Sequence, residues 1–233
     1  MHGEGFSAAV EAQHHRLDRS QYGNVYVVGD VHGCRETVGK LLDALELAGD
    51  DLVVFVGDLV RRGPDSRGVI DLVRSSPNLL SVRGNNEEKL VRGRRRLPEL
   101  TAADVRWLRS LPLVVSWTGH VVVHGGIDPR KPRERLTVPE LQNTSSISAD
   151  ASSRPYWWER YDGPDRVFFG HTVLERPYVG DAVVGLDTGC VYGGRLTAYD
   201  CGNDRLVAVE PPRTYHDRPP EKFVSPSPEA SVT

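Results

Sequence analysis

The first half of the chain alternates fully apolar runs with segments that are apolar on one side only. The apolar runs are rich in valine and leucine, and the first two end in Gly-Asp, at 29–30 and 57–58. The segments between the runs repeat apolar residues every three or four positions, as amphipathic helices do. The pattern predicts strands at 25–30, 52–57 and 79–82, alternating with helices at 35–48 and 65–74.

The pattern changes to β-structure after Pro112. A short helix is expected after Asn86 and another at about 101–111, where Thr101 and Asp104 have the spacing of a capping box. The Thr118-Gly119 pair between two apolar runs indicates a hairpin. The strands expected in this half are 113–117, 120–124, 166–170, 182–186, 196–200 and 206–209.

These elements predict one α/β domain over residues 24–210. Residues 1–23 are polar and unpatterned, so we expect a flexible N-terminal arm. Residues 127–164 have little periodicity and are expected to be an insertion over the site. Residues 211–233 are rich in proline and polar residues, which predicts a disordered C-terminal tail.

Composition narrows the class of protein. The 233 residues include 29 basic and 32 acidic side chains, a net charge of −3, which argues against a general nucleic-acid or anionic-membrane binder. No apolar run approaches the roughly 20 residues that span a bilayer, and the start lacks the apolar core of a signal peptide. The three cysteines are too few and scattered for a disulfide framework. We expect a soluble, cytoplasmic protein.

Polar side chains beside glycine follow several of the expected strands. Because ligands bind at the carboxyl edge of parallel strands, these side chains form a candidate site. They offer oxygen and imidazole donors without a thiolate, a set that suits Mn²⁺, Fe or Zn²⁺ and is large enough for two ions. Two ions about 3.5–4 Å apart clamp a phosphoryl group and activate water, so the expected reaction is phosphoester hydrolysis. The candidate metal ligands are Asp30, His32, Asp58, Asn85, His124 and His171.

Two arginines flank these motifs. Arg62 and Arg83 carry planar guanidinium groups, which can hold phosphate oxygens with two parallel hydrogen bonds. They are the candidate phosphate-binding residues.

Six motifs follow one another along the chain: GDVHGC at 29–34, GDLVRRGP at 57–64, RGNNE at 83–87, HGG at 124–126, GHT at 170–172 and LDTGCVYGG at 186–194. Together they resemble the calcineurin-like metallophosphatases, in particular the phosphoprotein phosphatase branch and its bacterial protein phosphatases and symmetrical diadenosine tetraphosphatases. The resemblance implies a β-sandwich flanked by helices, with a dinuclear centre. It assigns Asp30, His32 and Asp58 to the first metal, and makes Asp58 a bridge to a second metal held by three further ligands, Asn85, His124 and His171.

Two positions depart from that family's pattern. The family usually has a histidine, its proposed general acid, where this chain has Asn86, and often has a paired aspartate where this chain has Arg61. An amide cannot give a proton to a leaving group, a role worth roughly 10²–10⁴-fold in rate. We therefore take Asn86 as a candidate catalytic position, beside Arg62 and Arg83. We hypothesise that leaving groups needing no proton are favoured, such as phosphoanhydrides and aryl phosphates.

Three functions remain open from the sequence. The first is a metal-dependent phosphatase for phosphoproteins or small phosphate esters. The second is a symmetrical bis(5'-nucleosyl)-tetraphosphatase, whose base would need an aromatic pocket. The third is a weakly active or non-catalytic metal-binding regulatory protein. The candidate base-binding residues for the second function are Tyr156, Trp157, Trp158 and Tyr192.

Overall fold

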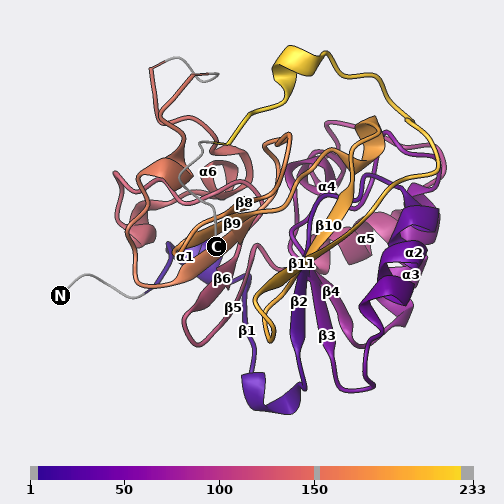
Figure 1. Ribbon diagram of the computed structural model, residues 1–233, viewed down its shortest axis with the longest axis horizontal. Helices are drawn as coiled ribbons and strands as arrows, with labels where there is room; N and C mark the ends of the chain where they lie inside the picture. The colour runs from indigo at the N-terminus through magenta and orange to yellow at the C-terminus, as the bar shows by residue number, and fades with distance from the viewer. Residues whose placement is uncertain (1–4, 150–152, 227–233) are drawn as a thin grey trace.

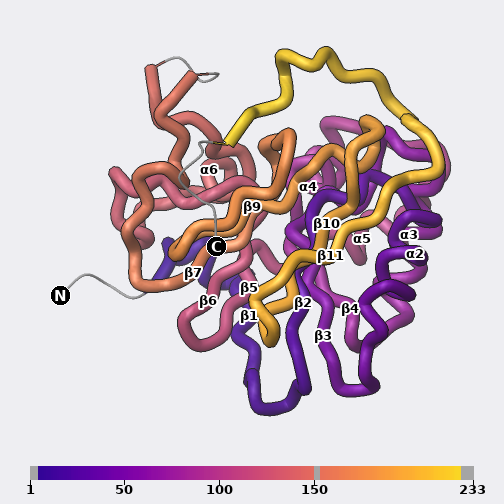
Figure 2. The backbone as a smooth tube through the Cα atoms, in the orientation of Figure 1, coloured from indigo at the N-terminus to yellow at the C-terminus, as the bar shows by residue number. Residues whose placement is uncertain are grey.

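The computed structural model of the protein describes residues 5–149 and 153–226. These residues form two β-sheets with helices outside them, which confirms the predicted α/β class (Figure 1, Figure 2). The helices are α1 (Ala8–Glu11), α2 (Arg35–Leu45), α3 (Ser66–Ser75), α4 (Asn85–Val91), α5 (Ala102–Ser110) and α6 (Val138–Asn143). The strands are β1 (His14–Arg16), β2 (Val25–Val28), β3 (Leu52–Phe55), β4 (Leu79–Ser81), β5 (Val114–Trp117), β6 (His120–Val122), β7 (Arg166–Phe169), β8 (Tyr178–Val179), β9 (Val183–Gly185), β10 (Leu196–Asp200) and β11 (Arg205–Val209).

The five-stranded sheet contains the predicted β-α-β-α-β unit. Its order is β11-β10-β2-β3-β4, with β2, β3 and β4 parallel and β10 antiparallel to both neighbours. Helices α2 and α3 cover its outer face at the right of Figure 1. The predicted capping box begins α5, where the Thr101 amide donates to Asp104 at 2.8 Å.

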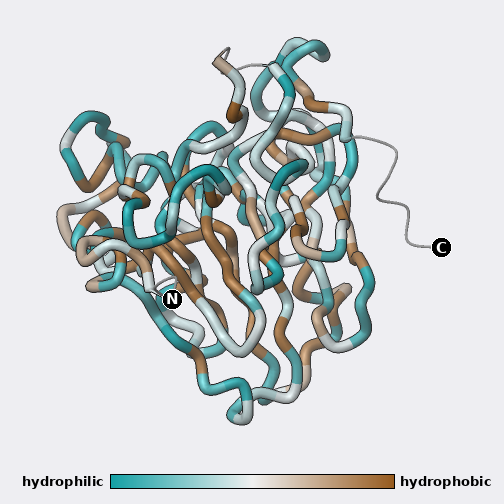
Figure 3. The backbone as a smooth tube through the Cα atoms, turned by 90° about the vertical axis from the view of Figure 1, so that its left-hand side faces the viewer, coloured by the Kyte–Doolittle hydropathy of each residue, from teal (hydrophilic) through white to brown (hydrophobic). Residues whose placement is uncertain are grey.

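The six-stranded sheet has the order β1-β5-β6-β7-β9-β8, and β6, β7 and β9 run parallel. The predicted hairpin joins β5 and β6 through Thr118-Gly119. The two sheets pack face to face. Alternate residues of each strand point to opposite faces of its sheet, so one set of apolar side chains lies between the two sheets. Val27 and Val54 point into the space between the sheets beside Phe168, whereas Val28 and Val53 point toward the helices. Figure 3 shows these apolar strands in brown beneath hydrophilic loops.

Residues 5–23 are not the loose arm that their composition suggested. Val10 is completely buried and Phe6 is 6% exposed, both against the outer face of the six-stranded sheet. Strand β1 then pairs in parallel with β5, and the ring of His14 lies 2.7 Å from the Ser116 hydroxyl. The segment is too short to show a clear periodicity of apolar residues. Its structure depends on the contacts that it makes with the six-stranded sheet. Residues 1–4 of the arm lie outside the described residues.

The described part of the predicted insertion, residues 127–149 and 153–164, mainly covers the same outer face. Trp157 and Trp158 are buried in that layer, so they are core residues and not platforms for a base. Only a few side chains of this segment, including Ser145 and Tyr156, reach the pocket described below. The expected position over the site therefore holds for a small part of the insertion.

The described part of the C-terminal segment is also ordered. Residues 211–226, in yellow in Figure 1, leave β11 and arch over the edge where the parallel strands end. Val224 forms a β-bridge with Leu174. The disorder prediction is therefore wrong up to residue 226, and residues 227–233 lie outside the described part. Among the described helices, none is long and apolar enough to cross a membrane.

Candidate metal centre

All six candidate ligands lie just beyond the carboxyl ends of parallel strands. Asp30 and His32 follow β2, Asp58 follows β3, and Asn85 follows β4. His124 and His171 follow β6 and β7 of the other sheet. The sandwich brings these five strand ends to one edge, so residues from distant parts of the sequence meet there.

The turns after the strands have an unusual backbone. His32, Asp58 and His171 have positive φ angles of 50°, 49° and 66°. Non-glycine residues avoid this conformation, and such strain is typical of functional sites. Three of the candidate ligands therefore lie on turns with a strained backbone.

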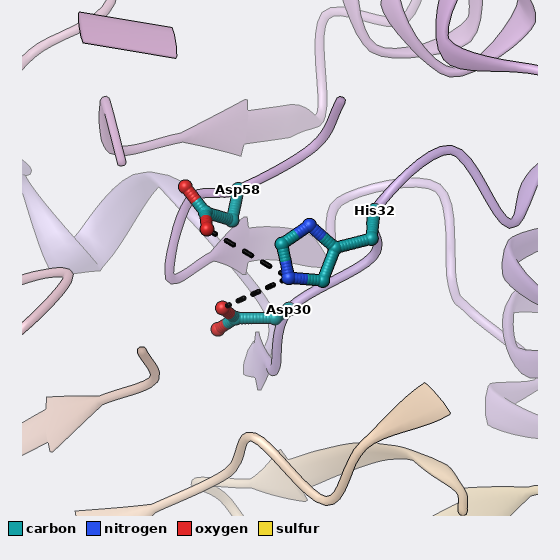
Figure 4. A group of neighbouring side chains, drawn as sticks. All are labelled: Asp30, His32 and Asp58. Carbon is teal, nitrogen blue, oxygen red and sulfur yellow. Dashed lines mark ion pairs between the residues drawn. The ribbon is translucent and has the colours of Figure 1, made fainter. Parts of the chain in front are cut away.

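Asp30, His32 and Asp58 form a compact buried group (Figure 4). The Nε2 atom of His32 lies 3.9 Å from Asp30 Oδ2 and 3.7 Å from Asp58 Oδ2. The Nδ1 atom of His32 lies 3.3 Å from the Val60 carbonyl, which leaves Nε2 to face the carboxylates. One cation between these three atoms would contact all of them.

His124 approaches Asp58 from the other sheet. Its Nδ1 atom lies 2.8 Å from the Val56 carbonyl, and its Nε2 atom lies 3.4 Å from Asp58 Oδ1. The carbonyl orients the ring in the way that carbonyls orient histidine ligands of metals. Asp58 therefore has one oxygen toward His32 and the other toward His124, the arrangement of a bridging carboxylate.

Asn85 and His171 complete the second half of the centre. The Asn85 amide nitrogen lies 3.0 Å from His171 Nδ1 and donates to Asn143 Oδ1 at 3.1 Å. The His171 and His124 rings are 5.2 Å apart. Both contacts use the amide nitrogen, and the carbonyl oxygen of Asn85 has no hydrogen-bond partner among the described residues.

Unpartnered buried atoms test whether metals fit here. Among the described residues, Asn85 Oδ1 and His124 Nε2 are buried without a hydrogen-bond partner. Both are lone-pair atoms of predicted ligands, and a buried acceptor without a partner is costly. Divalent cations would satisfy both atoms, so the donor set fits the predicted metals.

The charges of the site favour the same ligands. Burial lowers the pKa of His32 to about 4, and burial with neighbouring His124 lowers the pKa of His171 to about 3, so both rings are neutral donors at pH 7. Burial and the charges of Asp187 and Asp58 raise the pKa of Asp30 well above its usual value. A divalent cation would relieve this repulsion between carboxylates.

Glu87 supports the metal loops, a role that sequence analysis missed. Its carboxylate accepts hydrogen bonds from the amides of Asp58, Val60 and Gly84, at 2.9, 3.2 and 2.8 Å. The side chain is completely buried. Glu87 therefore ties the turn after β3 to the start of α4, and its place in the RGNNE motif was the available signal.

Asn86 and Arg61, the two departures from the expected pattern, contact each other. Arg61 donates to Asn86 Oδ1 at 2.8 Å, and Asn86 Nδ2 donates to Asp58 Oδ2. Because arginine only donates and a carboxylate only accepts, the two neighbours set the orientation of the amide. Asn86 is therefore held as a hydrogen-bond donor at the centre.

The two candidate phosphate-binding arginines point to different places. Arg62 lines the pocket, with a guanidinium nitrogen 3.0 Å from His32 Nε2. Arg83 is buried and points away, bonding the Arg109 carbonyl at 2.6 Å and pairing with Glu88 at 2.9 Å. Arg83 therefore does not line the pocket, and its donors hold α4 to the end of α5, while its predicted contact with phosphate stays a prediction.

A pocket of about 760 Å³ opens over the centre. His32, Asp58 and Asn85 line its floor, and its rim is rich in cations. Sequence analysis missed four of these cations, although Lys89 could have been found because it follows Asn85 by one helical turn. The four are Lys89, Arg154, Arg218 and Lys222.

A comparison with known protein families decides the class. Residues 23–184, which contain all six candidate ligands, match the calcineurin-like phosphoesterases. The chain belongs to the calcineurin-like phosphoesterase family. It is therefore a hydrolase that acts on phosphoesters, as predicted, and this family uses a dinuclear site of divalent metals.

Relatives in this family carry several substrate names. The asymmetrical bis(5'-nucleosyl)-tetraphosphatase PrpE of Oceanobacillus iheyensis is 29% identical, over 78% of this chain and 90% of its own length. Serine/threonine-protein phosphatase 1 of Salmonella typhimurium is 31% identical, over 80% and 96%. A symmetrical bis(5'-nucleosyl)-tetraphosphatase of Janthinobacterium is 27% identical, over 83% and 98%. Phosphoester hydrolysis is common to these names, while the substrate differs.

A solved structure also resembles the chain closely. It is described as a proposed diadenosine tetraphosphatase, and it superimposes with a TM-score of 0.76 and 30% identity over 85% of this chain and 97% of its own. This similarity confirms the predicted metallophosphatase architecture.

Proposed function

We propose that the protein is a dinuclear metal-dependent hydrolase of phosphoanhydrides, with dinucleoside tetraphosphates as its preferred substrates. The observation that carries the proposal is the pairing of Asn86 with Arg61, at the position where this family usually has an acidic proton donor. The proposal favours the second of the three functions that the sequence left open, but it does not choose between symmetrical and asymmetrical cleavage.

The chain's own residues hold the metals and the phosphate. Asp58 would bridge the ions, with Asp30 and His32 on one side and Asn85, His124 and His171 on the other. When bound, the two ions supply charge that polarises a phosphoryl group and lowers the pKa of water. Mn²⁺ is the first candidate, with Fe or Zn²⁺ as alternatives, because the donors are oxygens and imidazoles. Arg62 would hold two phosphoryl oxygens.

Asn86 decides which leaving group is tolerated. Its amide can donate a hydrogen bond to a leaving oxygen but cannot transfer a proton. A nucleotide released from an anhydride is a stable anion and needs no proton. The alkoxide released from phosphoserine is far more basic and needs one. Arg61 adds positive charge next to the amide, which stabilises an anion at this point.

A phosphoprotein substrate is the second candidate. The observation that favours it is the 31% identity to serine/threonine-protein phosphatase 1 of Salmonella typhimurium. This reading requires another group to protonate the serine oxygen, or the use of phosphotyrosine instead. A regulatory protein without activity is the third reading, and it predicts no turnover with any divalent metal.

The test compares three substrates with added Mn²⁺: diadenosine tetraphosphate, a phosphotyrosine peptide and a phosphoserine peptide. We expect the rates to fall in that order, because the leaving groups become more basic. Identification of the cleaved products separates symmetrical from asymmetrical cleavage. Equal rates on all three substrates would rule out the proposal.

Variants at two positions sharpen the test. Asn86→His should raise phosphoserine turnover, and Asn86→His with Arg61→Asp should raise it further, toward the roughly 10²–10⁴-fold that a general acid contributes. The double variant is stronger because Arg61 beside the new imidazole would disfavour its protonated form. Asn86→Gln, which adds no titratable group, is the control.

A further inference from the structure

The segment of residues 214–226, which we call the C-terminal strap, is held across the metal edge by its backbone. The amides of Tyr215 and His216 donate to the Val191 carbonyl at 3.1 and 3.0 Å. At the other end, the Val224 amide donates to Val173 at 2.8 Å, and its carbonyl accepts from Glu175 at 3.0 Å. Figure 1 shows the strap in yellow, passing over the ends of the strands. The strap is therefore fixed at both ends and crosses between them.

Tyr192 connects the strap to the metal edge. The Arg218 guanidinium lies 5.1 Å from the Tyr192 ring centre, and Arg62 lies 5.4 Å from the same ring. The ring of Phe223, in the strap, meets Tyr192 edge-on at 6.2 Å. Cations over an aromatic ring are held in place without losing their charge. The strap and the phosphate-binding Arg62 thus share one support.

The strap contributes one wall of the pocket and brings two cations to it. Arg218 is half-buried and Lys222 is exposed, and both line the pocket together with Arg62 and Lys89 from the metal edge. Glu221 is the strap carboxylate in this wall and offsets one of the charges. Arg218 donates from Nε and Nη2 to the Lys222 carbonyl at 3.2 and 2.8 Å, so its remaining N–H groups and the Lys222 ammonium face further phosphates. The phosphoryl group being cleaved would be held by the metals and Arg62.

We propose that the C-terminal strap is a substrate-binding element in which Arg218 and Lys222 hold the phosphates that are not being cleaved. The site therefore selects a nucleotide with a chain of several phosphates over one with a single phosphate. Phe223 and Val224 line the same wall and offer apolar surface to the nucleoside. This inference rests on the proposed anhydride hydrolase and assigns its substrate class to particular residues.

The test measures binding without turnover. Calorimetry compares adenosine monophosphate with the imido analogue of adenosine triphosphate, each added to the metal-loaded protein with Mg²⁺ in excess. In R218Q/K222Q, we expect the ratio of the triphosphate to the monophosphate dissociation constant to rise about tenfold, as for loss of charged hydrogen bonds. K222Q alone should show part of this effect, and it keeps Arg218 against Tyr192.

The matched control removes a charge from the neighbouring segment. Arg213 is exposed, lies 5.3 Å from the Tyr215 ring and does not line the pocket. R213Q should therefore leave the ratio unchanged. An equal effect of R213Q would mean that only net charge matters, and it would overturn the proposal.

Kinetics separate this inference from the proposed function. In R218Q/K222Q, we expect KM for diadenosine tetraphosphate to rise more than KM for p-nitrophenyl phosphate, by about tenfold. If the protein hydrolyses no anhydride but the calorimetric ratio still changes, the proposed function fails and the strap assignment stands. An unchanged ratio overturns the strap assignment. So does a larger loss of affinity for a phosphopeptide than for the triphosphate.

Discussion

The floor of the pocket and the wall that the C-terminal strap forms, which we call the roof, are built in different ways. On the floor, His32 and Asp58 lie within four residues of a strand and are 3% exposed. In the roof, Arg218 and Lys222 come from a strap whose own residues are largely exposed. The floor has little freedom because burial and strained turns position it, whereas backbone bonds at its two ends hold the roof. Our proposals thus assign the chemistry to local motifs and the choice of substrate to long-range docking.

The largest effect should come from the floor. Asp58→Asn should lower turnover of p-nitrophenyl phosphate with Mn²⁺ at least about 10³-fold, because this carboxylate contacts both halves of the centre. Elemental analysis should show less bound metal in the same variant. Asp43→Asn, at an exposed aspartate on α2, is the control and should keep full activity. If Asp58→Asn retained a tenth of the activity, Asp58 would not be the bridge.

A pair of arginines separates a catalytic role from a structural one. Arg62→Ala should lower kcat/KM by about 10²-fold, as for loss of one preorganised donor, with little change in stability. Arg83→Ala should instead lower the free energy of unfolding by about 3 kcal/mol, because Glu88 loses its buried partner. Steady-state kinetics and urea unfolding of both variants measure these effects.

The opposite pattern would reverse the assignment. A loss of activity in fully folded Arg83→Ala would restore Arg83 as a phosphate-binding residue. A stable and fully active Arg62→Ala would remove Arg62 from the site and leave the roof cations as the main phosphate contacts.

The smallest effect should come from the far end of the five-stranded sheet, away from both regions. Burial opposes the charge of Asp200, but hydrogen bonds from Asn203, Asn24 and Arg205 outweigh it and lower the pKa to about 2. Asp200→Asn should cost about 1–2 kcal/mol of stability at pH 7 without changing turnover per folded molecule.

The pH dependence of that cost has a definite sign. Because the folded pKa lies below the ordinary value of 3.8, the ionised form stabilises the protein above pH 4, and this contribution is lost as the pH falls through about 2. Urea midpoints of the wild type and Asp200→Asn should therefore differ at pH 7 and pH 4 and converge toward pH 2. A constant difference would contradict the assigned role.

Much of the fold and the floor was predictable because both depend on short-range patterns. Strands β2 and β3 are buried on both faces of the sheet, so they stand out in the sequence as continuous apolar runs. The direction of the Arg83 side chain was not predictable, because it depends on Arg109 and Glu88, which contact it in the folded protein. Residues 5–23 and the strap were misjudged because their order comes from surfaces that other segments provide.

The sequence by itself determined the class of chemistry. It places six candidate metal ligands at the ends of strands, each beside a glycine, and their order can be recognised without knowing which distant residues are in contact. Only the tertiary structure decided that Asn86 is held by Arg61, that Arg83 supports α4 and α5, and that the strap closes one side of the pocket. The reason is physical. A strand and its turn are specified by neighbouring residues, whereas the direction of a long cation depends on which distant carbonyls, carboxylates and rings surround it in the folded protein.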